Sequence, residues 1–208
     1  MRLTGLPRPN QTLAAVVAAA ASDCPQNDPE CDSVGWPGGS CYVLSMATLE
    51  LVRTDHADAL LTFELENRSY FAASVPDRGD DFFAHFDERH AGLLAWQAAG
   101  TDYFHVLVGD SGEVLGRVNL TEIADGCGEL GFRIAEKATG RGLATAGVRQ
   151  VCALASKEYG LARLRARATT DNHGSRTVLA RTGFTETGTI LLNGQPGISY
   201  SRSLANNA

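Results

Sequence analysis

Regular patterns of apolar and polar side chains begin only near Met46 and continue to Leu204. Alternation with a period of two predicts half-buried strands, and apolar residues three or four positions apart predict helices. The predicted order, βααβββαβαββ, is that of an α/β domain. The predicted strands are 47–53, 103–109, 114–123, 128–135, 162–169, 183–190 and 198–204, and the predicted helices are 55–67, 80–98, 142–159 and 173–182.

Local signals support several of these elements. Asp55 is of a residue type that caps helices, and it stands at the start of the first predicted helix. The turn Asp110-Ser111-Gly112 separates two predicted strands and indicates a hairpin. Gly160 follows the apolar stripe of the third helix and predicts its end.

The first 45 residues differ from the rest of the chain. Residues 23–40 are dense in Pro, Gly, Asp, Asn and Ser, which interrupt regular structure. We expect residues 1–45 to be a disordered extension or an upstream region, with Met46 as the real start. A third reading stays open, because Arg2 and Arg8 precede the apolar run 13–21, as in a secretory signal peptide.

Composition narrows the class of protein. With 208 residues and 44% apolar residues, the chain has room for one globular domain and a tail. A net charge of −6 argues against a nucleic-acid partner, and no apolar run reaches the 18 residues of a membrane span. Its five cysteines show no zinc-site spacing, so we expect no metal, and Cys152 is expected to be a small buried residue.

The most informative stretch is the loop between the strand ending at Ala135 and the helix beginning near Gly142. Its sequence from Glu136 is EKATGRGLAT. Glycine lets a backbone approach a ligand closely, and the first turn of a helix offers unpaired N–H groups to an anion such as pyrophosphate. Arg141 adds a cation between Gly140 and Gly142. The dinucleotide-binding pattern needs a third glycine where Thr145 stands, and the Walker pattern is absent.

This loop and two later segments resemble those of the GNAT acetyltransferases, in particular the RimJ/RimL branch. The family's loop reads Gln/Arg-x-x-Gly-x-Gly/Ala, and here Lys137 replaces its first residue. The later segments are DNHGS, from Asp171 to Ser175, and LARTGF, from Leu179 to Phe184. The resemblance covers about residues 46–205. It implies the GNAT acyl-CoA N-acyltransferase fold, an α/β (α+β) domain whose mixed central sheet of six to seven strands is flanked by about four helices.

The resemblance also implies where the co-substrate acetyl-CoA binds. The N–H groups of residues 141–145 would hold its pyrophosphate, the main chain of residues 132–135 would pair with its pantetheine arm, and Asn172 would bond that arm or a water. The implied cofactor-binding residues are Phe132, Arg133, Ile134, Ala135, Lys137, Gly140, Arg141, Gly142, Leu143, Ala144, Thr145 and Asn172.

Acetyl transfer to an amine needs a base for the amine and an acid for the leaving thiolate. Glu129 begins the cofactor strand, where some GNAT branches place a glutamate base. The alternative is that Glu129 only pairs with Arg133 on the same strand face. Ser175 matches a serine near the leaving sulfur in RimL-like members, and its alternative role is to cap or pack the last helix. Glu122 and Glu186 are lesser candidates for the base.

In the family, the end of the first helix forms a wall of the acceptor site, so Glu64, Asn67, Arg68 and Tyr70 are the candidate substrate contacts. Each could instead belong to a solvated helix face. Strand 162–169 places three arginines, Arg163, Arg165 and Arg167, on one face. They form a solvated sheet edge, or they attract the 3′-phosphate of CoA or an acidic acceptor.

Together these observations predict a cytoplasmic N-acetyltransferase that moves an acetyl group from acetyl-CoA directly to a primary amine. The acceptor is expected to be a protein N-terminus or an amine-bearing small molecule, with no membrane partner, and the enzyme a monomer or homodimer. The alternative is a non-catalytic acyl-CoA-binding sensor. It would need Gly140, Gly142 and Asn172 but neither Glu129 nor Ser175.

Overall fold

A computed structural model describes residues 47–204. The expectations for residues 1–45, for the apolar run 13–21 and for Met46 as the start lie outside these residues. So do Cys24, Cys31 and Cys41. The two cysteines within the described range, Cys127 and Cys152, form no disulfide, and Cys152 is buried as expected.

The centre of the fold is a seven-stranded sheet in the order β1-β2-β3-β4-β5-β7-β6. All neighbours are antiparallel except β4 and β5, which are parallel. The predicted mixed sheet of six to seven strands is therefore confirmed. Its strands are β1 (Thr48–Leu51), β2 (Tyr103–Val108), β3 (Val114–Ala124), β4 (Cys127–Ile134), β5 (Arg163–Thr169), β6 (Thr185–Leu192) and β7 (Gln195–Ser203).

Helices cover both faces of the sheet, and there are more of them among the described residues than the four predicted. The expected helix 80–98 is divided at His85, whose φ of −114° and ψ of 32° lie outside the helical range. A separate short helix also follows the first one. The helices are α1 (Ala57–Glu66), α2 (Arg68–Ala72), α3 (Asp80–Ala84), α4 (Phe86–Ala98), α5 (Leu143–Lys157) and α6 (His173–Arg181), with short 3₁₀ turns η3 (Thr54–His56) and η4 (Glu136–Ala138).

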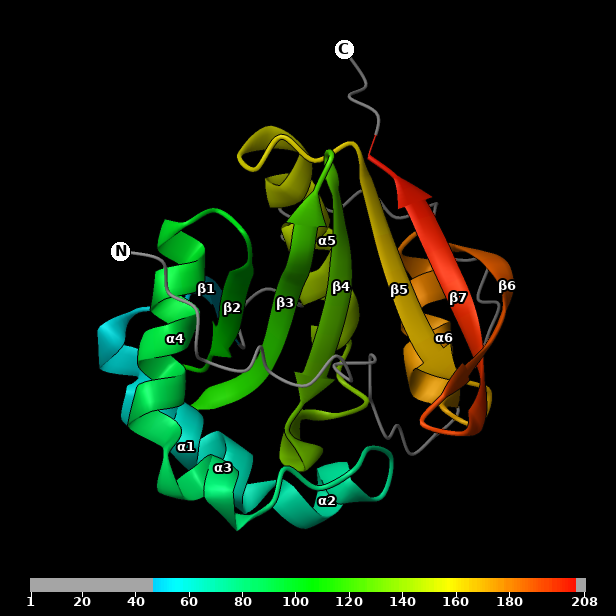
Figure 1. The fold of residues 1–208 in the computed structure, drawn as a ribbon. Helices are drawn as coiled ribbons and strands as arrows, with labels where there is room; N and C mark the ends of the chain where they lie inside the picture. Colours follow the sequence, from blue (N-terminus) through cyan, green and yellow to red (C-terminus); the bar gives the residue numbers. More distant parts are fainter. Residues whose placement is uncertain (1–46, 205–208) are drawn as a thin grey trace, which may run out of the picture.

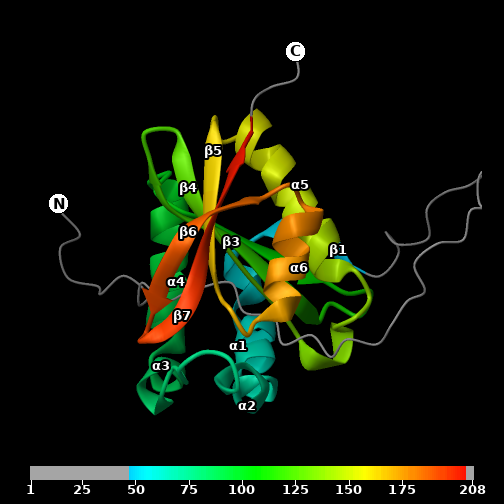
Figure 2. The same cartoon turned by 90° about the vertical axis from the view of Figure 1, so that its right-hand side faces the viewer.

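The two faces of the sheet carry different helices. Helices α5 and α6 lie on one face, and α1 and α4 lie on the other, over β1 to β3 (Figures 1 and 2). Apolar side chains from both layers meet the sheet in one continuous core, for example Phe63 of α1, Leu120 of β3 and Val148 of α5. Burial of such side chains supplies the main stabilisation of the domain.

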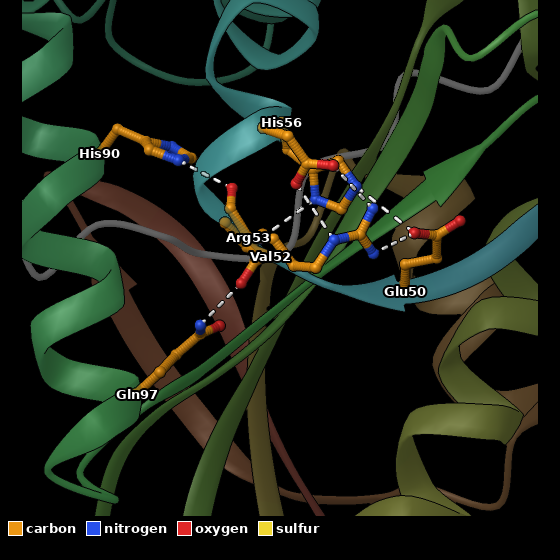
Figure 3. A network of polar contacts seen from close by, with 7 residues as sticks. Glu50, Val52, Arg53, His56, His90 and Gln97 are labelled. Carbon is orange, nitrogen blue, oxygen red and sulfur yellow. Dashed lines mark hydrogen bonds and ion pairs between the residues drawn. The ribbon is translucent and has the colours of Figure 1, made fainter.

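Side-chain hydrogen bonds fix the turn between β1 and the first helix. Asp55 does not cap this helix, because its carboxylate accepts hydrogen bonds from the Arg53 guanidinium at 3.1 Å. The Arg53 main-chain N–H instead donates to His56 Nδ1 at 3.1 Å. From α4, Gln97 donates to the carbonyl of Val52 at 2.9 Å, and His90 Nε2 lies 3.0 Å from the Arg53 carbonyl (Figure 3). Side chains of α4 thus satisfy the two main-chain carbonyls that follow the last residue of β1.

Candidate active site

The strands β4 and β5 separate in the middle of the sheet. They pair only from Cys127 to Glu129 of β4, opposite Arg163 to Arg165 of β5. Beyond that point β4 stays paired with β3 as far as Ile134, and β5 stays paired with β7 as far as Thr169. The two strands diverge visibly towards their carboxyl ends in Figure 1. Residues 130–134 of β4 therefore have an edge that no described strand occupies.

The main-chain groups on this edge follow from the strand pairing. The Ala135 N–H donates to the Leu115 carbonyl at 2.8 Å, so Ala135 is bonded toward β3. Because bonding direction alternates along an antiparallel pair, the N–H and C=O groups of Phe132 and Ile134 face the gap. Of the expected pantetheine partners, Phe132 and Ile134 offer their main chain to the gap, and Arg133 and Ala135 do not.

The predicted phosphate loop leads from the end of β4 into α5. Gly140 and Gly142 have φ of 73° and 75°, in the left-handed region that glycine adopts without strain. A Cβ on Gly140 would meet nothing within 4 Å, so the loop faces open space. Gly142 is the N-cap of α5, and no side chain caps this helix end. The N–H groups of the first turn and the helix dipole thus suit an anion, and Arg141 beside them is exposed. The predicted residues fit a pyrophosphate group.

Two residues of the predicted acceptor wall are attached to this loop. The Asn67 side chain accepts a hydrogen bond from the Glu136 N–H at 2.9 Å and donates to the Phe63 carbonyl at 2.8 Å. Tyr70 is half-buried and hydrogen-bonds Thr139; burial raises the pKa of Tyr70, and the Thr139 bond lowers it in part. Lys137 is exposed, 3.8 Å from a carboxylate oxygen of Glu66. The structure thus brings Asn67, Tyr70 and the loop together.

Glu64, another predicted acceptor contact, lies inside the protein with only 2% of its surface exposed. Its Oε1 accepts from Arg117 at 2.7 Å, and its Oε2 accepts from Arg133 at 2.9 Å and lies 3.5 Å from Arg78. Burial alone would raise the pKa of Glu64, but the guanidinium groups outweigh it and lower the pKa to about 2. We call Glu64, Arg78, Arg117 and Arg133 the buried cluster.

The remaining wall residue, Arg68, makes ion pairs on the surface. Its guanidinium binds Asp77 and lies 2.7 Å from Asp80, and it stacks over the Phe83 ring at 4.8 Å. These contacts hold the segment between α2 and α3 against the helices.

Glu129 lies at the point where β4 and β5 part. It is buried, and its Oε1 accepts hydrogen bonds from Nε and Nη2 of Arg167 at 2.7 and 2.6 Å. The second oxygen, Oε2, takes no part in these bonds. The expected alternative partner, Arg133, binds Glu64 instead, so the proposed Glu129–Arg133 pair is wrong. Burial raises the pKa of Glu129, and Arg167 reduces that increase. Sequence reasoning missed this partner because only the register of β4 with β5 brings Arg167 next to Glu129.

Asn172 and Ser175 lie across the gap, at the start of α6 after the end of β5. The Ser175 N–H donates to Asn172 Oδ1 at 2.9 Å, so Asn172 caps α6. Ser175 has none of its surface exposed. Helix α6 is on the α5 side of the sheet (Figure 2), whereas Glu129 shares a strand face with Arg133, which binds Glu64 of α1. The two predicted catalytic residues are thus on opposite faces of the sheet.

An open cavity of about 510 Å³ lies on the face that carries Glu129. It is lined by Glu122, Glu129, Arg163, Arg165, Ala166, Arg167, Thr187, Ser199, Tyr200 and Ser201. The interpretation of the β5 arginines as a sheet edge is wrong, because β5 lies between β4 and β7. Arg163 and Arg165 are exposed because no described helix covers this part of the sheet (Figure 1).

Other features of the described residues concern metals and membranes. Residues 47–204 contain no group of three or more His, Cys, Asp or Glu side chains placed to hold a metal ion. None of the helices in this range is both long and apolar enough to cross a bilayer.

Solved structures with this fold include several acetyltransferases. The ribosomal-protein-S5-alanine acetyltransferase from Vibrio fischeri superposes with a TM-score of 0.73 at 21% identity, covering 77% of this chain and 94% of that one. RimJ from Mycobacterium smegmatis, in complex with CoA-disulfide, gives 0.68 at 23%, covering 76% and 81%. A point mutant of the spermidine N-acetyltransferase SpeG from Vibrio cholerae gives 0.63 at 16%, covering 77% and 95%.

These likenesses confirm the predicted fold and agree with the RimJ/RimL resemblance. Among curated proteins none matches this sequence. The model of the acetyltransferase (GNAT) domain, however, matches residues 47–185, which is more than half of the chain. The chain therefore belongs to the GNAT acetyltransferase family.

Proposed function

We propose that this protein transfers the acetyl group of acetyl-CoA to a primary amine, by direct attack of the amine while both molecules are bound. The observation that carries the proposal is the unpaired edge of β4 over residues 130–134, beside the uncapped start of α5. An extended pantetheine arm fits such an edge as an added strand does. The pyrophosphate then takes the N–H groups of the first turn of α5.

Glu129 is the proposed base. Its position at the point where the strands part puts it beside the end of an arm that lies along residues 130–134. A raised pKa makes a carboxylate a stronger base, and the unbonded Oε2 can accept the proton of the amine directly or through water. Arg167 thus binds one oxygen of the base, and Glu129 also lines the open cavity of about 510 Å³.

Ser175 is the proposed acid, on the opposite side of the gap. Its hydroxyl would pass a proton to the CoA thiolate, and a main-chain N–H of β4 would stabilise the developing negative charge on the carbonyl oxygen. Asn172 holds the first turn of α6, and thereby Ser175, in place.

The acceptor wall is assigned to α2 in this proposal. Tyr70 keeps its proposed role as an acceptor contact, and Asn67 and Arg68 position the wall through their bonds to Glu136 and Asp77. Glu64 is too deeply buried to reach an acceptor and acts through Arg117 and Arg133.

The names of the structural neighbours suggest which amines the acceptor could be. One structural neighbour is named for the alanine of ribosomal protein S5 and another for spermidine, so both protein N-termini and small amines belong to the proposed range. Action in the cytoplasm, as a monomer or homodimer, is part of the same proposal.

The alternative is an acyl-CoA-binding sensor without turnover. Two observations favour it: Arg167 already neutralises Glu129, and Ser175 is fully buried in a helix start. Alanine at both positions separates the two functions. An enzyme loses amine-dependent thiol release, whereas a sensor keeps its acetyl-CoA affinity and has no release to lose.

The first experiment is a calorimetric titration with acetyl-CoA, followed by measurement of thiol release with a panel of peptide and small amines. Binding together with amine-dependent release is the expected result. Absence of acetyl-CoA binding would overturn the proposal, and binding without release from any amine would favour the sensor.

A further inference from the structure

Three arginines of β5 form a positively charged row beside the proposed base. Arg163, Arg165 and Arg167 alternate along the strand, so their side chains share one face. Arg167 is compensated by Glu129 at 2.6 Å. Arg163 and Arg165 are exposed, and within residues 47–204 neither forms an ion pair. We call these three residues the arginine row.

The row is an exception in this protein. The chain has a net charge of −6, so its surface as a whole is acidic. Like charges on alternate strand residues are about 7 Å apart and repel each other by about 0.6 kcal/mol even in water. An anion bound between them would remove this repulsion, which makes the row a natural site for carboxylates.

The cavity around the row is lined mainly by polar residues, and its lining also includes Ala166, Tyr200 and one further acidic residue, Glu122. On the neighbouring strand β7, Ser201 lies opposite Arg165 and Ser199 lies opposite Arg167 in the strand register. Their hydroxyl groups, with that of Thr187, offer hydrogen bonds to an incoming chain. A cavity of about 510 Å³ is large enough for a ligand of several residues.

The 3′-phosphate of CoA is a poor candidate for this site. Arg163 lies opposite Cys127, at the amino end of β4, and the phosphate loop follows Ile134 at the other end. Seven residues of strand separate these two points by about 23 Å. The nucleotide end of CoA is therefore far from the row, which lies on the acceptor side of the base.

The length of the row suits a peptide better than a single amino acid. Arg163 and Arg167 are four residues apart, which is about 13 Å along a strand. An extended acceptor whose amine reaches Glu129 places the side chains of its third and fifth residues about 7 and 13 Å away, and both would be turned to the same side.

We propose that the arginine row selects acidic protein N-termini as acceptors: Arg165 and Arg163 bind carboxylate side chains at about the third and fifth positions of the substrate while its amine lies at Glu129. This inference rests on the proposed acetyltransferase function and names its substrate class.

The test uses hexapeptides with one N-terminal alanine and either Asp, Asn or Lys at positions three and five. We expect kcat/KM to be about 3- to 10-fold higher for the Asp peptide than for the Asn peptide, mainly through KM, and lowest for the Lys peptide. The preference should shrink at about 0.5 M salt, because salt screens exposed charges.

Measured at a pH above the acid limb of the rate profile, because Arg165 also lowers the pKa of Glu129, the double variant R163Q/R165Q should lose the preference while keeping its kcat for the Asn peptide and its affinity for acetyl-CoA. The matched control is R181Q, because Arg181 is an exposed arginine of α6 on the other face of the sheet, and it should behave as wild type. An unchanged preference in R163Q/R165Q, or no preference in the wild-type enzyme, overturns the inference but not the proposed function.

A binding measurement keeps the inference testable if no peptide is acetylated. Fluorescence anisotropy of the Asp peptide, labelled at its carboxyl end, should show binding to the wild-type protein and about 3- to 10-fold weaker binding to R163Q/R165Q. Such a difference without acetylation of any peptide would show that the row binds peptides but overturn the inference that it selects acceptors, and it would leave small amines as the proposed substrates. Equal binding to both proteins would overturn the inference.

Discussion

The same face of the sheet carries two groups of arginines that differ in what covers them. The buried cluster lies over β3 and β4 beneath α1, where Arg117 and Arg133 are directly opposite each other in the strand register. The arginine row lies on β5, with Arg163 and Arg165 in the part paired with β4 and Arg167 beyond it, and no described helix covers the row. Like charges opposite each other destabilise a sheet, so the first group requires Glu64 between them. The repulsion among the arginines of the row is small enough to be tolerated, because water and salt screen exposed charges.

The number of arginines on a sheet face therefore says little about their role. Arg78 illustrates the effect of burial, which lowers its pKa to about 9 despite the nearby Glu64. Arg117 and Arg133, with 6% and 8% of their side chains exposed, serve the architecture, because a partner cannot reach them. Arg163 and Arg165 have no such constraint, so their charge is available to a ligand.

The largest expected effect is that of removing the central carboxylate of the buried cluster. E64Q leaves buried guanidinium groups without a counter-charge, and we expect it to lower the free energy of unfolding by about 3–5 kcal/mol. Urea unfolding measures the loss. The control E66Q changes an exposed glutamate of the same helix and should cost less than about 0.5 kcal/mol. Equal losses in both variants would contradict the assigned role of Glu64.

The pH dependence of stability should distinguish the two groups as well. The pKa of Glu64 is lowered in the folded protein to about 2, so its contribution is complete above pH 4.5 and disappears as the pH falls to 2. The loss amounts to about 3 kcal/mol, and E64Q should lack it. The pKa of Glu129 is raised, so Glu129 has the opposite sign and favours the folded state at low pH. Unfolding curves of wild type, E64Q and E129Q between pH 2 and 6 test both signs.

A smaller effect is expected on catalysis from changes at Glu129 and Arg167, which lie between the buried cluster and the exposed arginines of the row. E129Q should reduce kcat by about 10²-fold, because glutamine cannot accept the proton of the amine. R167Q removes a guanidinium that lowers the Glu129 pKa, so the acid limb of the kcat/KM profile should move to higher pH. Stopped assays of thiol release over pH 5–9 measure both effects. An unchanged acid limb in R167Q would show that Glu129 is not the group that titrates.

The smallest effect is expected on stability in the arginine row. R163Q/R165Q should change the free energy of unfolding by less than about 0.5 kcal/mol, because both side chains are exposed. A thermal melt beside wild type and E64Q measures the difference. A loss comparable to that of E64Q would mean that the row is a structural feature and not a ligand site.

Much of the fold could be predicted from the sequence because its signals are local. The order of the strands along the chain and the helix after Gly142 follow from patterns within a few residues. The partners of charged residues could not be predicted, because they depend on how distant strands align. Glu129 and Arg133 share a strand face as expected, yet their partners, Arg167 and Glu64, come from β5 and α1.

The position of β5 in the middle of the sheet could not be predicted from local patterns either. A strand of alternating arginines has the composition of an edge, but β7 pairs with β5 over its whole length. Arg78 lies in a segment with no regular pattern, and nothing in the sequence indicates that it approaches Glu64.

The bond between Asn67 and Glu136 has a consequence for redesign of this protein. One amide joins the end of the acceptor wall to the turn that precedes the phosphate loop, and Tyr70 adds a second link to Thr139. We therefore expect that a wall transplanted from another enzyme displaces the proposed phosphate loop unless both hydrogen bonds are transplanted with it. The arginine row has no comparable link to that loop. Under the proposed roles, we therefore expect that charge preference can be exchanged alone, whereas the shape of the wall can be exchanged only together with the loop.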